Sequence, residues 1–137
     1  PYSPHRHNTV PGDNIGVRVE NKETGKNLFY APGLGELEPH VLPYLEDADC
    51  LLVDGTLWTN NEMIQRGISD KLGSEMGHLD QSGAGGIMEI LNRLEKPRKI
   101  LIHINNTNPI LDEESPECMA LRAAGIEISH DGLEIEL

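Results

Sequence analysis

Cys-Leu-Leu-Val-Asp-Gly-Thr, residues 50–56, is the stretch that decides the fold class of this 137-residue chain. Four consecutive apolar residues are typical of a short strand that is buried on both faces, as in a parallel sheet. The run ends in a polar turn that begins at Asp54. A second apolar run, residues 99–104, is followed by the polar segment 105–109. Two buried strands with helical sequence between them predict an α/β domain.

The segments around these two strands predict a mixed sheet flanked by helices. Further strands are expected at 15–20 and 27–31, joined by a turn, and at 126–129 and 133–137, joined by Asp131-Gly132. Helices are expected at 38–47, 60–67, 82–95 and 115–125. Helices between strands favour parallel neighbours, whereas the two hairpins add antiparallel pairs. We therefore expect one mixed sheet.

The composition narrows the class of partner. The formal net charge is −12, which would repel a phosphate backbone, so nucleic acid is excluded as a partner. Apolar runs are only a handful of residues long, so no membrane span is expected. No signal peptide is visible, and we expect a bacterial cytoplasmic protein. Cys50 and Cys118 are far apart in the sequence and are expected to be buried free thiols.

Three polar clusters carry the candidate chemistry, at residues 54–56, 77–83 and 103–108. Two of them directly follow an apolar strand. In open α/β sheets, ligands bind beyond the carboxyl ends of the strands, where loops can present polar groups. We therefore expect these clusters to contribute to one site.

Asp54 and His78 are candidate catalytic residues. A carboxylate after four apolar residues needs a partner, because burying an unpaired charge is costly. Asp54 orienting His78 would form a proton relay. The alternative is that Asp54 accepts hydrogen bonds from the N–H groups of its own turn, and that His78 belongs to a helix-entry loop.

His103 is a candidate metal ligand, and its neighbours are candidate substrate contacts. Burial behind Ile-Leu-Ile is expected to favour the neutral imidazole that a metal requires. The alternative is a core histidine bonded to a backbone carbonyl. Asn105 and Asn106 suit hydrogen bonding to a substrate, or simple turn formation. Arg6 lies in a basic cluster that suits either a clamp for a substrate carboxylate or a solvated loop.

Four motifs resemble the family of coenzyme PQQ synthesis protein B. They are residues 28–36, 50–58, 76–83 and 102–112, of which Ile-His-Ile-Asn-Asn-Thr-Asn-Pro is the most specific. The family is similar to the metallo-β-lactamase superfamily, especially its ribonuclease Z branch. The resemblance implies a four-layer α/β/β/α sandwich. It also implies that residues 1–137 form only the C-terminal half, since the superfamily's first metal motif is not in this sequence.

The resemblance also assigns roles to three residues. His103 looks like the last metal-binding histidine of the superfamily, and His78 like the proton-donating histidine of the ribonuclease Z branch. Asp54 lies where that branch has a glutamate. Hydrolases carry a bridging aspartate where this chain has Gly33. Because two metals need a bridging ligand, a mononuclear site is favoured over a dinuclear hydrolytic one.

The resemblance implies a role in the biosynthesis of pyrroloquinoline quinone (PQQ). It suggests iron-dependent hydroxylation of the tyrosine ring of a precursor derived from Glu and Tyr, with zinc as the alternative metal. A carrier that exports PQQ or its precursor towards the periplasm is the alternative function. With His103 as its only metal ligand, the chain alone is expected to be inactive and to bind metal weakly. Exposed core surface would favour a homo-oligomer.

Overall fold

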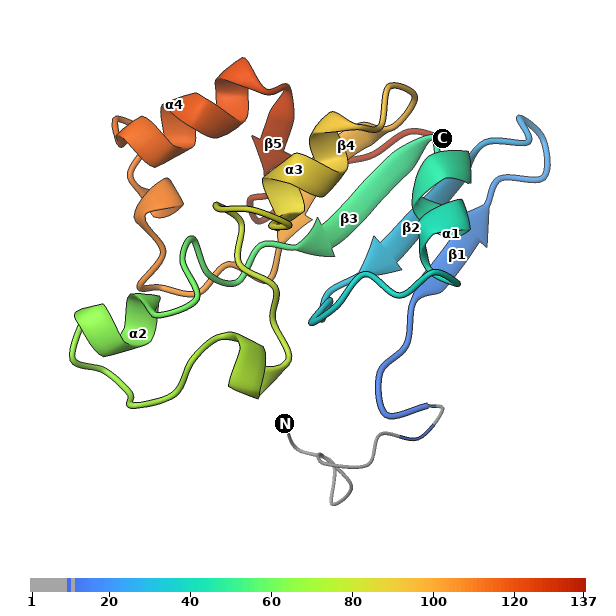
Figure 1. Ribbon diagram of the computed structural model, residues 1–137. Helices are drawn as coiled ribbons and strands as arrows, with labels where there is room; N and C mark the ends of the chain where they lie inside the picture. The colour runs from blue at the N-terminus through green and yellow to red at the C-terminus, as the bar shows by residue number, and fades with distance from the viewer. Residues whose placement is uncertain (1–9, 11) are drawn as a thin grey trace.

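The strands form one five-stranded sheet in the computed structural model, which describes residues 10 and 12–137. β1 (Val17–Glu20) pairs antiparallel with β2 (Asn27–Ala31). β2, β3 (Cys50–Asp54), β4 (Arg98–Ile102) and β5 (Ile126–Ile128) follow in parallel, so that spatial order equals chain order (Figure 1). The expected mixed sheet is confirmed. The parallel arrangement brings the carboxyl ends of β3 and β4 to the same edge.

The helices are α1 (Leu42–Asp47), α2 (Glu62–Gln65), α3 (Ile87–Asn92) and α4 (Pro116–Ala123), with 3-10 turns η1 (Ser74–Met76) and η2 (Pro109–Leu111). α1, α3 and α4 cover one face of the sheet, whereas α2 lies beyond the carboxyl ends of the strands (Figure 1). Leu45 of α1, Leu91 of α3 and Leu121 of α4 pack with Leu51 and Leu101 of the sheet in one core. None of the described helices has the length and apolar character needed to cross a bilayer.

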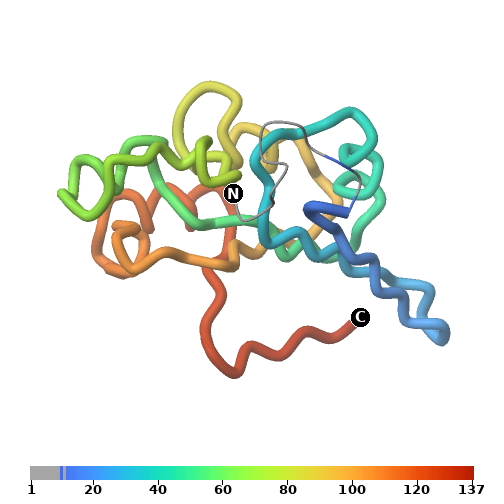
Figure 2. The backbone as a smooth tube through the Cα atoms, turned by 90° about the horizontal axis from the view of Figure 1, so that it is seen from below, coloured from blue at the N-terminus to red at the C-terminus, as the bar shows by residue number. Residues whose placement is uncertain are grey.

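The opposite face of the sheet is covered only in part. The C-terminal segment 129–137 runs along this face, on the side away from α1 (Figure 2). It ends where Asn21 Nδ2 donates to the Leu137 carbonyl, 2.8 Å away. Cys50 is buried here, and burial raises the pKa of its thiol. Val17 and Val19 on β1 stay exposed.

Two predictions are wrong: the last strand, 133–137, and the start of the helix predicted at 82–95. Residues 133–137 do not form a strand paired with β5, although a turn at Gly132 (φ +82°) is present. The predicted helix 82–95 begins only at Ile87. Gly83 and Gly85 take positive φ values of 92° and 75°, which a right-handed helix cannot include.

The predicted helix 60–67 is shorter than expected. α2 spans Glu62–Gln65, with Asn61 in the position before its first residue. The Asn60 side chain does not cap this helix. Its Oδ1 accepts from the backbone N–H of Ser74 at 2.8 Å and so ties the start of α2 to η1.

Candidate functional site: an Asp–His–His cluster

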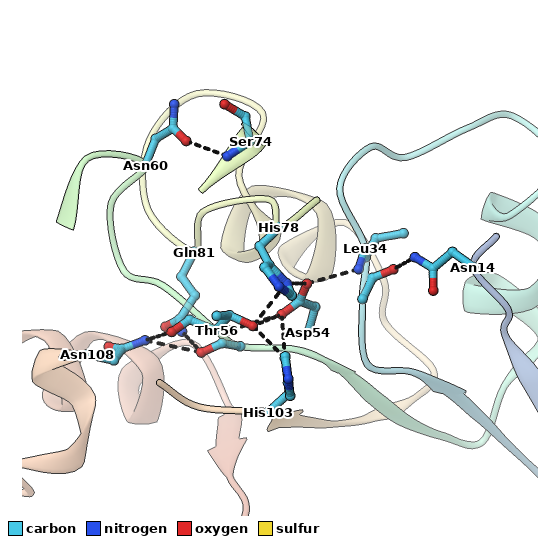
Figure 3. A network of polar contacts seen from close by, with 12 residues as sticks. Asn14, Leu34, Asp54, Thr56, Asn60, Ser74, His78, Gln81, His103 and Asn108 are labelled. Carbon is cyan, nitrogen blue, oxygen red and sulfur yellow. Dashed lines mark hydrogen bonds and ion pairs between the residues drawn. The ribbon is translucent and has the colours of Figure 1, made fainter. Parts of the chain in front are cut away.

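Asp54, His78 and His103 converge at the carboxyl edge of the sheet. Asp54 is the last residue of β3, His103 directly follows β4, and His78 follows η1. Their potential ligand atoms all lie within 4.8 Å of one another. Figure 3 shows the two imidazoles on either side of the carboxylate, from three different segments of the chain. The edge predicted from the sequence is therefore where these three side chains meet.

The Asp54 carboxylate is fully buried and fully hydrogen-bonded. Its Oδ2 accepts from the backbone N–H of Leu34 at 2.9 Å and lies 2.7 Å from His78 Nδ1. Its Oδ1 accepts from the N–H of Thr56 at 3.0 Å and lies 2.5 Å from the Thr56 hydroxyl oxygen. A carboxylate offers about four acceptor sites, and these four contacts fill them. Asp54 is therefore placed to orient its neighbours rather than to ligate a metal.

His78 is held by Asp54 from one side. An ionised carboxylate only accepts, so Nδ1 of His78 donates to Asp54, and its Nε2 then carries the lone pair. The loop reaches Asp54 through close backbone packing: Leu79 N–H donates to the Leu34 carbonyl at 2.8 Å. A Cβ on Gly35 would stand 2.9 Å from the Gly77 carbonyl oxygen, so this approach requires glycine.

His103 has an unusual backbone and an exposed side chain. It is the one non-glycine residue with positive φ (57°) among the described residues. Its side chain is 55% exposed, so the expected burial behind β4 is wrong. Nδ1 lies 2.8 Å from the Thr56 hydroxyl oxygen and 4.0 Å from Asp54 Oδ1. The strand is buried, but the left-handed backbone at His103 leaves the ring exposed at the sheet edge.

A shell of buried amides holds the loop that carries Asp54 and Thr56. Gln81, which is fully buried, donates through Nε2 to the Gly55 carbonyl at 2.5 Å. Asn108 Nδ2 donates to the carbonyls of Gly55 and Thr56 at 3.1 and 3.2 Å. Gly55 itself is required, because a Cβ there would lie 2.8 Å from the Leu101 side chain. Sequence reasoning missed Gln81, Asn108 and the Thr56 hydroxyl, since a polar residue in a loop gives no sign of its burial.

The predicted substrate contacts are not part of the Asp–His–His cluster. The Asn105 side chain donates to the Thr107 hydroxyl at 2.6 Å, so it is engaged within its own loop. Asn106 is exposed and lines a hollow of about 490 Å³ together with Arg66. Arg6 lies outside the described residues. The structure therefore brings together the candidate catalytic and metal residues, and places Asn105 and Asn106 in the adjoining loop.

The loop before α1 approaches the site without an acidic side chain at Gly33. Leu34 reaches Asp54 through its backbone N–H, whereas the Gly33 carbonyl accepts from Asn14 Nδ2. A Cβ on Gly33 would meet that Asn14 amide at 3.2 Å. Asn14 thus occupies the space beside Gly33.

Residues 2–104 match the family model described as a β-lactamase superfamily domain. The chain belongs to this superfamily. Within it, relatives named coenzyme PQQ synthesis protein B match over all 137 residues, with 66% identity in Methylococcus capsulatus, 61% in Stutzerimonas stutzeri and 56% in Pseudomonas putida. The resemblance inferred from the four motifs is confirmed. The chain spans about 45% of the length of these relatives.

A solved structure of the superfamily has the same fold. The crystal structure described as Zn(2+)-bound PqqB from Methylobacterium extorquens superposes with a TM-score of 0.85 at 37% identity. The match covers 94% of this chain and 45% of that one. The α/β class with a mixed sheet is thereby confirmed. The zinc in that relative, together with the Asp–His–His cluster in this chain, supports a metal cofactor.

Proposed function

We propose that this chain contributes part of a metal site to a protein of PQQ biosynthesis. The observation that carries the proposal is the convergence of two imidazoles on one fully bonded carboxylate within 4.8 Å. The names of the relatives support a role in PQQ biosynthesis, and the geometry supports the choice of residues. In this proposal His103 ligates the metal, Asp54 orients His78, and His78 moves a proton to or from the substrate.

The donor set fits a metal that accepts imidazole nitrogen. Imidazole suits iron and zinc alike, and two histidines with one carboxylate and open positions favour mononuclear iron in oxygen chemistry. Because the oxygens of Asp54 are already engaged, the carboxylate ligand must come from elsewhere in the protein. Iron bound there would supply the O₂ chemistry. The residues of this chain would orient the ring and handle its protons.

The proposed reaction is hydroxylation of the tyrosine ring in a precursor derived from Glu and Tyr. One atom of O₂ enters a ring C–H bond, and the other is reduced to water by two electrons from an external reductant. His78 is suited to hold the phenol proton of the substrate, because Asp54 keeps its Nε2 side available. Asn105, Asn106 and Arg6 are the proposed substrate contacts, and the carboxylates of the precursor are what Arg6 would bind.

We further propose that residues 1–137 form the C-terminal half of an α/β/β/α sandwich. The face of the sheet opposite the helices carries exposed apolar side chains at Val17, Val19 and Tyr30. A second sheet packed there would bury them, as two-layered sheet domains require. A homo-oligomer and a bacterial cytoplasmic location stay predictions.

The test is anaerobic reconstitution of the full-length gene product with ferrous iron, followed by the precursor, a reductant and O₂. We expect mass spectrometry to detect a product that has gained oxygen. His103→Ala should abolish iron binding, and His78→Asn should keep iron but slow turnover about 10²- to 10⁴-fold. The zinc-loaded protein is the matched control. Tight binding of unchanged precursor, indifferent to chelators, would instead support a carrier, and hydrolysis with two metals would support a hydrolase.

A further inference from the structure

The Thr56 hydroxyl occupies the centre of the Asp–His–His cluster. Its Oγ1 lies 2.5 Å from Asp54 Oδ1, 2.8 Å from His103 Nδ1 and 3.1 Å from His78 Nδ1. Thr56 is buried, at the start of the loop that follows β3. One hydroxyl therefore contacts all three candidate functional side chains (Figure 3).

The direction of each hydrogen bond follows from the carboxylate. Two backbone N–H groups, from Leu34 and Thr56, already point at the two oxygens of Asp54. An ionised carboxylate carries no proton, so both oxygens accept every contact made to them. The Thr56 hydroxyl, at 2.5 Å from Oδ1, must then place its only proton on that contact.

The same reasoning determines the tautomer of His103. With its proton directed to Asp54, Thr56 Oγ1 can only accept from its other neighbours. The 2.8 Å contact to His103 Nδ1 is therefore an N–H donated by the imidazole. In a neutral ring the lone pair is then on Nε2. Within residues 10 and 12–137, no other hydrogen bond is made by the His103 ring, so Thr56 alone selects its tautomer.

We propose that Thr56 is a positioning residue that selects the Nδ1-protonated tautomer of His103 and links it to the Asp54–His78 pair. For a metal site, the second ring N–H of a ligating histidine almost always has an acceptor that fixes its orientation. The acceptor is usually a carboxylate or a backbone carbonyl. Here it is the Thr56 hydroxyl, which donates its own proton to Asp54. The consequence for metal binding rests on the proposed function, whereas the tautomer itself does not.

The hydrogen bond from His103 to Thr56 also explains how an exposed imidazole can hold one orientation. The ring of His103 is more than half exposed and packs against His78 only through a tilted contact, with centroids 5.1 Å apart. An exposed imidazole with no partner would sample several rotamers and both tautomers. The bond to the buried hydroxyl restricts it to one of each, and so leaves Nε2 of His103 free to bind a metal.

The test begins with the metal-free full-length gene product labelled with ¹⁵N-histidine. Two-dimensional ¹H–¹⁵N spectra distinguish the tautomers, and we expect neutral His103 to be protonated on Nδ1. Thr56→Val removes the hydroxyl at similar size and should populate the Nε2-protonated form. Thr56→Ser keeps the hydroxyl and should preserve the wild-type tautomer. Zn²⁺ affinity, measured by competition with a chelator, should fall about 10- to 100-fold in Thr56→Val and stay near wild type in Thr56→Ser.

An Nε2-protonated His103 in the wild-type spectrum would overturn the proposal, and this result does not depend on whether any variant folds. Unchanged tautomer and unchanged Zn²⁺ affinity in Thr56→Val would also overturn it, and would leave Thr56 as a turn residue only. The expected tautomer shift without any precursor hydroxylation by the iron-loaded protein would refute the proposed function and keep the role of Thr56. The two failures are thus distinguishable.

Discussion

At the scale of single residues, the backbone of His103 is the feature that most directly links fold to site. A left-handed conformation costs a residue with a Cβ roughly 1–2 kcal/mol. The cost is borne because hydrogen bonds hold the backbone on both sides of His103: Gly55 N–H donates to the Ile102 carbonyl at 2.8 Å, and Asn105 N–H donates to the Thr56 carbonyl at 3.1 Å. The left-handed conformation is therefore fixed at His103, and the imidazole lies beside Thr56 and Asp54. Strain held by its surroundings in this way is common at functional sites.

This strain predicts an asymmetry between two substitutions at the same position. His103→Ala and His103→Gly both remove the imidazole, so both should lose the metal. Glycine adopts φ near 57° freely, whereas alanine does not. We expect His103→Gly to be more stable than His103→Ala by about 1 kcal/mol in urea unfolding. Equal stability of the two variants would show that the left-handed backbone is not strained.

Three site residues could be predicted from the sequence because each follows a recognisable signal. Asp54 and His103 stand directly after apolar strands, and His78 stands in a glycine-rich loop. The role of Thr56 could not be predicted, since a hydroxyl in a turn is ordinary. The exposure of the His103 side chain was also missed, because a change of backbone φ at the end of a strand leaves no pattern in neighbouring residues.

At the scale of elements, the loop between β4 and η2 acts as a brace for the loop after β3. Asn108 joins the two: its Nδ2 reaches two carbonyls of the β3 loop, and its Oδ1 accepts from Ile110 N–H at 3.1 Å at the start of η2. Asn108 is buried, so these groups have no access to water. The position of the loop bearing Asp54 and Thr56 therefore depends on this amide.

Replacing this amide should weaken both the fold and the site. Asn108→Ala leaves the Ile110 N–H without its acceptor and removes one of the two donors at each of the Gly55 and Thr56 carbonyls, at about 1–3 kcal/mol. Asn106→Ala, two residues earlier on an exposed side chain, is the matched control and should change stability by less than about 0.5 kcal/mol. Urea unfolding of the three proteins measures the difference. A similar cost in both variants would show that the brace does not depend on Asn108.

The start of a helix could be predicted where a capping side chain determines it. It could not be predicted where the backbone conformation of glycine or tertiary burial determines it. α4 begins as expected, because Ser115 Oγ accepts from the Cys118 N–H at 3.0 Å and Pro116 occupies the first turn. The apolar periodicity before Pro97 correctly indicates a helix, but it cannot show that Gly83 and Gly85 delay the start. The 133–137 segment alternates as a strand would. It instead runs unpaired along the sheet face, with its apolar residues half-buried, an outcome that depends on tertiary contacts.

The pairing of β4 with β5 is reinforced by an ion pair whose effect should depend on pH. Arg98 Nε and Nη2 each donate to the Glu127 carboxylate at 2.8 Å, and these hydrogen bonds hold the pKa of Glu127 below its usual value. A lowered pKa means that the pair stabilises the fold fully above the pKa of the unfolded chain, about 4.3. The stabilisation is lost as the pH falls through the lower pKa of the folded state.

Glu127→Gln should therefore lower the stability at pH 7 by about 0.5 kcal/mol, the usual size for an exposed pair. The difference from wild type should shrink below pH ~4. Glu136→Gln, an exposed carboxylate on the C-terminal segment, is the control and should show no such dependence. Unfolding free energies at pH 7 and pH 3 give the measurement. A difference that stays constant between these pH values would contradict the assignment.

At the scale of the whole molecule, the two faces of the sheet are unequal. One face is closed by α1, α3 and α4, whereas among the described residues only the 129–137 segment covers the other (Figures 1 and 2). Val17 and Val19 lie on β1 with side chains 40% and 50% exposed, beside Tyr30 on β2. We expect an apolar strip of this kind to be an interaction surface. In relatives, more than half of the chain length lies outside the region that matches this one.

If the strip is covered in the full-length protein, the same substitutions should have different effects in the 137-residue chain and in the full-length gene product. In the 137-residue chain alone, the strip is open, and Val17→Thr with Val19→Thr should reduce self-association measured by sedimentation, with little change in stability. In the full-length gene product the second sheet would cover it, and the double substitution should cost about 1 kcal/mol for each buried hydroxyl. Ile64→Thr, an exposed apolar residue on α2, is the control and should change neither quantity. The result would be contradicted if the double variant of the 137-residue chain associated as strongly as wild type and the full-length double variant were as stable as wild type. The strip would then be ordinary solvent-exposed surface. Only a face covered by the rest of the protein makes the cost of these hydroxyls differ between the two settings.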